Sequence, residues 1–206
     1  LDRVLVDLSV GMPINESLGR YTGSLAALDA EFAKWARDKA NELAPKADWS
    51  TPEIPRRASV EVIITWLKDH PNNYAALQRL AEAQLTAKDL PAAKITLAKM
   101  IELYPAGGTP YAFLARIHRE EKNVKAEREM LLKIAALAAS DLDVFARLSE
   151  LSAEAGDWET ARKYTLRSLG VNPLHPDTHR RAARAAEQLK DHALAIESYQ
   201  ALLLLE

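Results

Sequence analysis

The sequence predicts an all-α protein, a solenoid of helical hairpins preceded by a small helical segment. The main observation is a fixed repeat period. Prolines follow helix-like runs at intervals of 34 and 68 residues, at Pro71, Pro105 and Pro173. Small residues share one phase at the same intervals, at Ala93, Ala161 and Ala195. The composition agrees, because 48% of the residues are hydrophobic and only 7 are glycine.

The clearest single repeat is residues 142–175, which predict a helix, a turn and a second helix. Phe145 and Leu148 fall at helical spacing on one face. Gly156 ends the first helix, since glycine readily takes the left-handed conformation found after helix ends. Pro173 ends the second helix, because proline disfavours helical backbone in the residue before it.

These landmarks resemble the tetratricopeptide (TPR) family, which has Leu and then a small residue in the first helix, Gly at the turn, a small residue early in the second helix and Pro at its end. Two departures stand out: Lys88 replaces the turn glycine, and Glu127 replaces the expected alanine, beside Ala126. No proline ends the run before Ala139, and Ser140 or Asp141 is available to cap the next helix. The resemblance implies a right-handed TPR α-solenoid.

The first 44 residues do not follow the repeat. Residues 3–10 are apolar enough for a strand or a short helix, and their spacing favours the helix. A second short helix starts near Pro13. Ser24 is a candidate N-cap for a third helix, which carries an apolar stripe to about Leu43. The stripe contains Leu25, Leu28, Phe32, Trp35 and Ala36.

This opening resembles the end of a gluzincin, or peptidase MA-like, metallopeptidase domain. The matching residues are Leu5-x-x-Leu8-x-x-Gly11, Glu16-Ser17-Leu18 and Gly23-Ser24-Leu25-x-x-Leu28-x-x-x-Phe32-x-x-Trp35. The alternative is an ordinary helical cap on the solenoid. No His-Glu-x-x-His occurs in the chain, so we expect any catalytic part of such a domain to lie upstream.

The remaining boundaries follow from prolines and the repeat phase. Residues 45–57 contain three prolines and predict a linker, which Trp49 and Ile54 can pin to a neighbouring surface. The predicted organisation is a helical segment 1–44, a linker 45–57 and a solenoid 58–206. Within the solenoid we expect a half repeat 58–73 and repeats 74–107, 108–141, 142–175 and 176–206.

Several function classes are disfavoured. The net charge of −2 gives no bias toward nucleic acid, and no apolar run is long enough to span a membrane. The chain has no Cys, no phosphate-binding glycine loop and no zinc-peptidase motif, so we predict no enzyme, no metal and no cofactor. His175 and His179 are four residues apart, but Pro176 lies between them. Solvated histidines are therefore the preferred interpretation.

Arginines give the best candidate site. In TPR proteins the first helix of each repeat lines the concave face, and arginine there can hold a partner's carboxylate in two-pronged fashion. The alternative is a solvated face of mixed charge. The Lys and Asn pattern of TPR domains that clamp a C-terminal carboxylate is absent. By this resemblance the partner-binding residues are Gln78, Glu82, Arg116, Arg119, Glu150, Arg180 and Arg184.

The predicted function is a non-catalytic protein-interaction scaffold, a TPR module of a larger, bacterial-type protein with a protein or peptide partner. Two alternatives stay open: an accessory region that positions substrate for a gluzincin-like peptidase, and a self-assembly element. The second rests on Leu202, Leu203 and Leu205, which we expect to leave an apolar patch and a weak homo-oligomer through the C-terminal helix. The composition fits a cytoplasmic or an exported protein.

Overall fold

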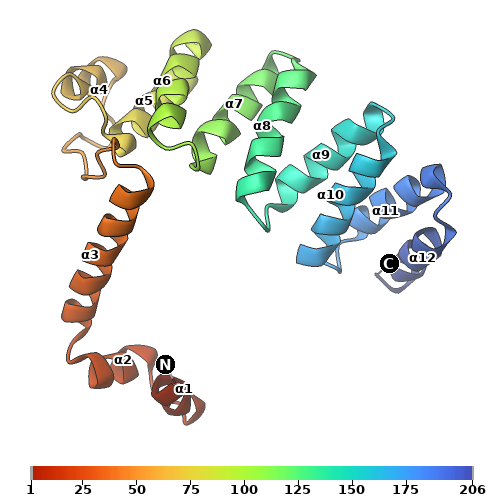
Figure 1. Cartoon of the computed structure of the whole chain (residues 1–206), viewed down its shortest axis with the longest axis horizontal. Coiled ribbons are helices and arrows are strands. Elements are labelled where there is room, and N and C mark those ends of the chain that lie inside the picture. Colours follow the sequence, from red (N-terminus) through yellow and green to blue (C-terminus); the bar gives the residue numbers. More distant parts are fainter. Residues whose placement is uncertain (1, 206) are drawn as a thin grey trace. The chain divides into compact units, whose positions relative to one another are not determined.

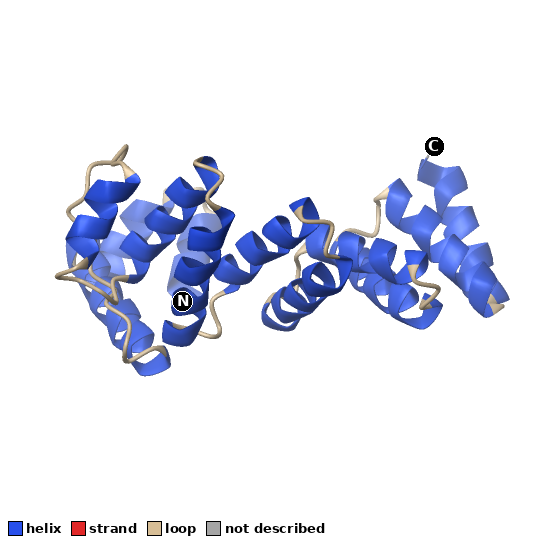
Figure 2. Ribbon diagram, turned by 90° about the horizontal axis from the view of Figure 1, so that it is seen from above, coloured by secondary structure: helices blue, strands red, loops and turns tan. Residues whose placement is uncertain are grey.

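The computed structural model describes residues 2–205, in which every regular element is a helix apart from one isolated β-bridge (Figures 1 and 2). The chain divides into two compact units, residues 1–76 and 77–206. The first unit contains α1 (Asp2–Ser9), α2 (Ile14–Thr22), α3 (Leu25–Leu43), α4 (Val60–Leu67) and the start of α5 (Tyr74–Thr86).

Polar contacts and one cap organise the first three helices. The buried hydroxyl of Ser17 in α2 donates to Asp7 Oδ2 in α1 at 2.8 Å. Ser24 caps α3 as predicted, because its hydroxyl accepts from the backbone N–H of Ala27 at 3.1 Å. No residue of α3 is buried, and the predicted apolar stripe leaves Phe32 63% and Trp35 57% exposed.

The proline-rich segment before α4 is held by side chains near the start of α5. The Asn73 amide nitrogen donates to Asp48 Oδ2 and to the carbonyl of Ser50, both at 2.9 Å. The rings of Trp49 and Tyr74 lie 5.1 Å apart, and Ile54 is buried. The hydrogen bond from Asn73 lowers the pKa of Asp48, which burial opposes. Residues 48–54 are therefore ordered against the start of α5.

The second unit is a row of antiparallel helix pairs (Figure 1). Its core is continuous from one pair to the next, because Tyr111 and Leu131 pack in the same cluster as Phe145, Leu148 and Tyr164. The small residues predicted to share a phase are all buried. The pairs are α5 with α6 (Leu90–Leu103), α7 (Gly108–Glu120) with α8 (Val124–Leu137), α9 (Leu142–Glu154) with α10 (Trp158–Val171), and α11 (Pro176–Leu189) with α12 (His192–Leu205).

The turn within each pair repeats at the 34-residue period. A left-handed residue ends the first helix each time, at Lys88, Lys122, Gly156 and Lys190. The next residue caps the second helix by accepting a backbone N–H bond, at Asp89, Asn123, Asp157 and Asp191. Only one of the four left-handed positions is glycine, so the repeated cap preserves the turn where glycine is missing.

The missing proline after α8 is replaced by side-chain contacts. Asp141 Oδ1 accepts from the backbone N–H of Val144 at 3.1 Å, which confirms one of the two predicted caps. Arg167 of α10 donates to the carbonyls of Ala135 and Ala138, at 3.0 and 3.2 Å. These carbonyls at the end of α8 are thereby satisfied by the next pair.

Cations on the second helices connect successive pairs. Each lies at the same repeat position and contacts an acid near the turn of the next pair. The contacts are Lys94 to Glu121 at 2.6 Å, Arg128 to Asp157 at 3.1 Å and Arg162 to Asp191 at 3.2 Å. Because Asp157 and Asp191 also cap helices, these contacts link helix starts to the preceding pair.

Candidate functional site on the first helices

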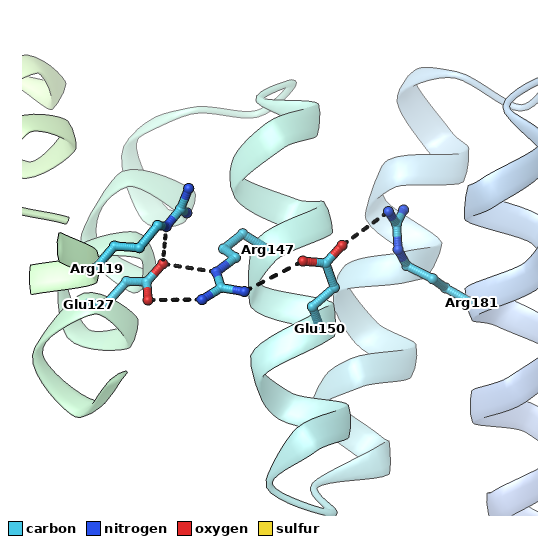
Figure 3. A network of polar contacts seen from close by, with 5 residues as sticks. All are labelled: Arg119, Glu127, Arg147, Glu150 and Arg181. Carbon is cyan, nitrogen blue, oxygen red and sulfur yellow. Dashed lines mark hydrogen bonds and ion pairs between the residues drawn. The ribbon is translucent and has the colours of Figure 1, made fainter. Parts of the chain in front are cut away.

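The centre of the candidate site is Glu127, whose side chain is buried with only 1% of the residue exposed. It lies one turn into α8, at the position that Ala93, Ala161 and Ala195 occupy in the other pairs. Its Oε1 accepts from Arg119 Nε at 2.7 Å and from Arg147 Nε at 2.9 Å (Figure 3). Its Oε2 accepts from Arg147 Nη2 at 3.1 Å.

A charge chain extends from Glu127 across four helices, from α7 to α11 (Figure 3). Arg147 of α9 lies 3.7 Å from Glu150 one turn further along the same helix. Glu150 Oε1 in turn accepts from Arg181 Nη2 of α11 at 3.2 Å. The charge chain, defined as Arg119, Glu127, Arg147, Glu150 and Arg181, therefore connects three consecutive first helices through one second helix.

The contact between Glu127 and its arginines favours the ionised form of the carboxyl group. Burial acts to raise the pKa of Glu127, but hydrogen bonds from Arg147 and Arg119 outweigh it, and the pKa lies below its ordinary value. The hydrogen bond to Glu127 raises the pKa of Arg147. The carboxylate is the only buried member, so its two arginines compensate the cost of removing it from water.

Two hollows open between successive first helices. The first has a volume of about 220 Å³ and lies between α7, α8 and α9. The second has a volume of about 130 Å³ and lies between α9, α10 and α11. Ala115 and Arg119 line the first hollow, and the residues 34 positions later, Ser149 and Ala153, line the second. The two hollows therefore share their lining positions on the first helix of each pair, whereas the second helix and the following helix line them with residues at different repeat positions.

One arginine at each hollow stacks on an aromatic ring. The Arg116 guanidinium lies 5.4 Å from the centroid of the Phe113 ring, and it lines the first hollow. The Arg184 guanidinium lies 5.4 Å from the centroid of Trp158, and it lines the second. Within the described residues neither has a carboxylate in ion-pair range. The ring electrons attract a cation at this distance, and the contact leaves N–H groups of the guanidinium available to a ligand.

The predicted partner-binding residues separate into three groups. Arg119 and Glu150 belong to the charge chain and also line a hollow, whereas Arg116 and Arg184 line a hollow without belonging to the charge chain. Gln78 donates to Glu82 on α5, outside both hollows, and Arg180 pairs with Asp177 on its own helix. Sequence reasoning did not place Glu127, Arg147, Arg181 or Trp158 among the partner-binding residues, although it grouped Arg147 and Arg181 with the other arginines of interest. The signal for Glu127 was its position in an alanine phase.

One histidine prediction is wrong. His175 is exposed, but His179 is buried, and its Nε2 lies 2.7 Å from the carbonyl oxygen of Pro173. The turn between α10 and α11 folds this ring against the loop that precedes it, so it is not solvated. Across residues 2–205 no three His, Asp or Glu side chains gather as a metal site requires. None of the helices in that range has the length and apolar character needed to cross a membrane.

No protein-family model matches the chain, and no curated protein matches it. Several solved structures, in contrast, are similar to the chain. The crystal structure of MamA shares 18% identity at a TM-score of 0.56, covering 71% of this chain and 85% of that chain. A MamA fragment from Desulfovibrio magneticus RS-1 shares 16% identity at 0.53, covering 71% and 82%. YrrB, described as a TPR protein with an unusual peptide-binding site, shares 14% identity at 0.58, covering 72% and 76%.

These similarities establish the fold. The chain is an all-α protein whose helices pack pairwise as TPR repeats, as the 34-residue period predicts. Identities below 20% carry no more than that. The resemblance of residues 1–44 to a gluzincin domain receives no support from any comparison and stays a prediction. The division into a segment, a linker and numbered repeats is likewise a prediction.

Proposed function

We propose that the chain is a non-catalytic protein-interaction module that holds a peptide segment across α7, α9 and α11. The observation that carries this proposal is a pair of hollows, one beside α7 and one beside α9, that share their lining positions on these first helices. Each combines apolar walls with a few charged groups, which is the usual character of a recognition site. The peptide-binding site named for YrrB, whose fold is similar, favours the same kind of ligand.

The charge chain supports this proposal by giving the face a fixed shape. Arg119 and Arg147 are held by one buried carboxylate, and Arg181 is held by Glu150. Side chains that are already ordered lose less entropy when a ligand binds. A segment that crosses α7, α9 and α11 therefore meets a preorganised surface.

Peptide selection tests the proposal. The full chain is used to select binders from a random peptide library, and each binder is measured against variants that fill one hollow, Ala112→Tyr and Ala153→Tyr. Ala136→Tyr, at an exposed position of α8 outside both hollows, is the control. We expect each filling variant to weaken binding about tenfold or more and the control to leave it unchanged. Binders that are indifferent to both filled hollows would contradict the proposal.

Self-assembly is a second candidate because of the exposed leucines of α12. Leu203 is 82% and Leu204 is 87% exposed, whereas Leu202 is buried. Of the three leucines expected to form a patch, Leu203 is exposed and Leu205 is half-buried, and the exposed Leu204 lies between them. Exposed apolar patches of this kind mark interfaces. Light scattering over a concentration series should detect association that Leu203→Glu/Leu204→Glu removes. A monomer at every concentration would exclude this role.

A further inference from the structure

Arg116 and Arg184 occupy the same repeat position, two repeats apart, because 184 − 116 is twice the 34-residue period. Both guanidinium groups lie over an aromatic ring, 5.4 Å from its centroid, and both line a hollow. At the intervening repeat the same position is Glu150, which already accepts from Arg181. At this repeat position, α7 and α11 therefore each carry an arginine without a carboxylate in ion-pair range among the described residues. The helix between them, α9, carries a glutamate that is paired with Arg181.

The other arginines of these first helices each contact an acidic side chain of this unit. Arg119, Arg147 and Arg181 contact Glu127 or Glu150, and Arg180 contacts Asp177. Asp143 lines the first hollow, and Glu154 lines the second together with Glu150, so each hollow also presents acidic groups. A ligand with many carboxylates would meet these acids. A ligand with one carboxylate at each stacked arginine would not need to approach them.

We infer that the segment bound on this face is an extended peptide with two carboxylate side chains, one held by Arg116 and one by Arg184. This inference rests on the proposed function and specifies its ligand. Each guanidinium can donate two parallel N–H bonds from its edge to a carboxylate while its face stays on the ring. Apolar side chains of the segment enter the two hollows, whose walls include Leu131 and Ile134 in the first and Trp158 in the second.

The geometry sets the spacing of the two carboxylates. Packed helices lie about 10 Å apart, so arginines two first helices apart are separated by about 20 Å. An extended chain rises about 3.3 Å per residue, so about six residues span this distance. The ligand is therefore a segment with two acidic residues about six positions apart and a mainly uncharged, partly apolar sequence between them.

Defined peptides test this inference. The probes are fluorescent peptides with blocked ends, each with two glutamates separated by two to eight alanine, serine or leucine residues. Matched peptides carry glutamine at one or both positions. Binding to the full chain is measured by fluorescence anisotropy at low and high salt. We expect one spacing to bind best, about tenfold tighter than its double-glutamine counterpart, with the difference reduced at high salt because exposed charges are screened.

Two variants locate the carboxylates. Arg116→Gln and Arg184→Gln should each weaken the best peptide about tenfold, and replacing the matching glutamate by glutamine should add no further loss in that variant. Lys125→Gln removes one exposed charge of α8 outside both hollows and should leave affinity unchanged. An equal loss in all three variants, or affinity independent of spacing, would overturn the inference.

The failure of this inference differs from the failure of the proposed function. If selected peptides bind the hollows but lack acids and ignore Arg116→Gln and Arg184→Gln, the proposed function stands and the two-carboxylate ligand is excluded. If no peptide responds to the filled hollows, the face is not a peptide site and both proposals fail. Circular dichroism of each variant should match the parent chain, because neither arginine makes an ion pair within the described residues.

Discussion

The pair α7–α8 and the pair α9–α10 fill the same buried position with different kinds of side chain. Where the two helices of a pair come together, α10 has Ala161 and α8 has Glu127, and both residues are 1% exposed. The alanine fits because it is small. The glutamate fits because Arg119 and Arg147 reach its carboxylate from α7 and from the next pair. The comparison indicates that a charge is accommodated at this buried position where one cation from the same pair and one from the next pair reach it.

The largest expected effect comes from placing a glutamate at the equivalent position of α10. Ala161→Glu should lower the free energy of unfolding by about 3 kcal/mol or more, because it buries a carboxylate without two cations of its own. The positions equivalent to Arg119 and Arg147 are Ala153 in the same pair and Arg181 in the next pair, and Arg181 already contacts Glu150. Urea unfolding followed by circular dichroism measures the change.

A second variant sharpens this test. Ala161→Glu/Ala153→Arg restores a cation at the position equivalent to Arg119 and should recover part of the lost stability. Equal stability of Ala161→Glu and the parent chain would mean that the position accepts a charge without help.

The next largest effect is steric. Ala161→Leu should cost about 2 kcal/mol, because overpacking a well-filled interior forces strained side chains. The control is Glu159→Leu, which changes an exposed side chain on the first turn of the same helix. Thermal unfolding of the two variants compares them directly. The same melting temperature in both would show that Ala161 does not mark a close approach of the helices.

The pH dependence of the stability contributed by Glu127 and its two arginines is a smaller effect. Glu127→Gln should cost about 1–2 kcal/mol at pH 7, because a neutral amide replaces the carboxylate between two arginines. The folded pKa of Glu127 is depressed, so its stabilising contribution is complete above its unfolded pKa of about 4.3 and is lost as pH falls through the folded value.

Urea unfolding of the parent chain and Glu127→Gln between pH 3 and 7 measures this dependence. The difference between the two chains should shrink toward pH 3. A difference that stays constant over that range would show that the effect comes from shape rather than charge.

The smallest effect concerns the turns of the same two pairs. Gly156 and Lys122 occupy equivalent left-handed positions, with φ of 75° and 56°. Lys122→Gly should stabilise the chain by about 0.5–1 kcal/mol, since a residue with a Cβ is strained in this conformation. Gly156→Lys should cost a similar amount. Thermal unfolding measures whether Lys122→Gly raises and Gly156→Lys lowers the melting temperature. An unchanged melting temperature in both variants would indicate that the caps at Asn123 and Asp157 determine the turn alone.

The sequence alone determined the helical repeat and much of its detail. The 34-residue period predicts paired helices, and the hydrogen-bonding capacity of the side chains predicts caps at Ser24 and at either Ser140 or Asp141, of which Ser24 and Asp141 are confirmed. The phase of Ala161 marked a buried position, and the same phase marked Glu127 as an exception. These features follow from local backbone chemistry and from spacing along one helix, which a sequence displays directly.

Only the tertiary structure decided which side chains meet. Arg147 reaches Glu127 from 20 residues away and Arg181 reaches Glu150 from 31 residues away, because packing brings separate helices together. The burial of His179 and the exposure of Phe32 and Trp35 also depend on what packs against each helix, not on its own periodicity. The stacking of Arg184 on Trp158 joins two helices in the same way. The period fixes which positions recur, and the contacts between helices fix what each position does.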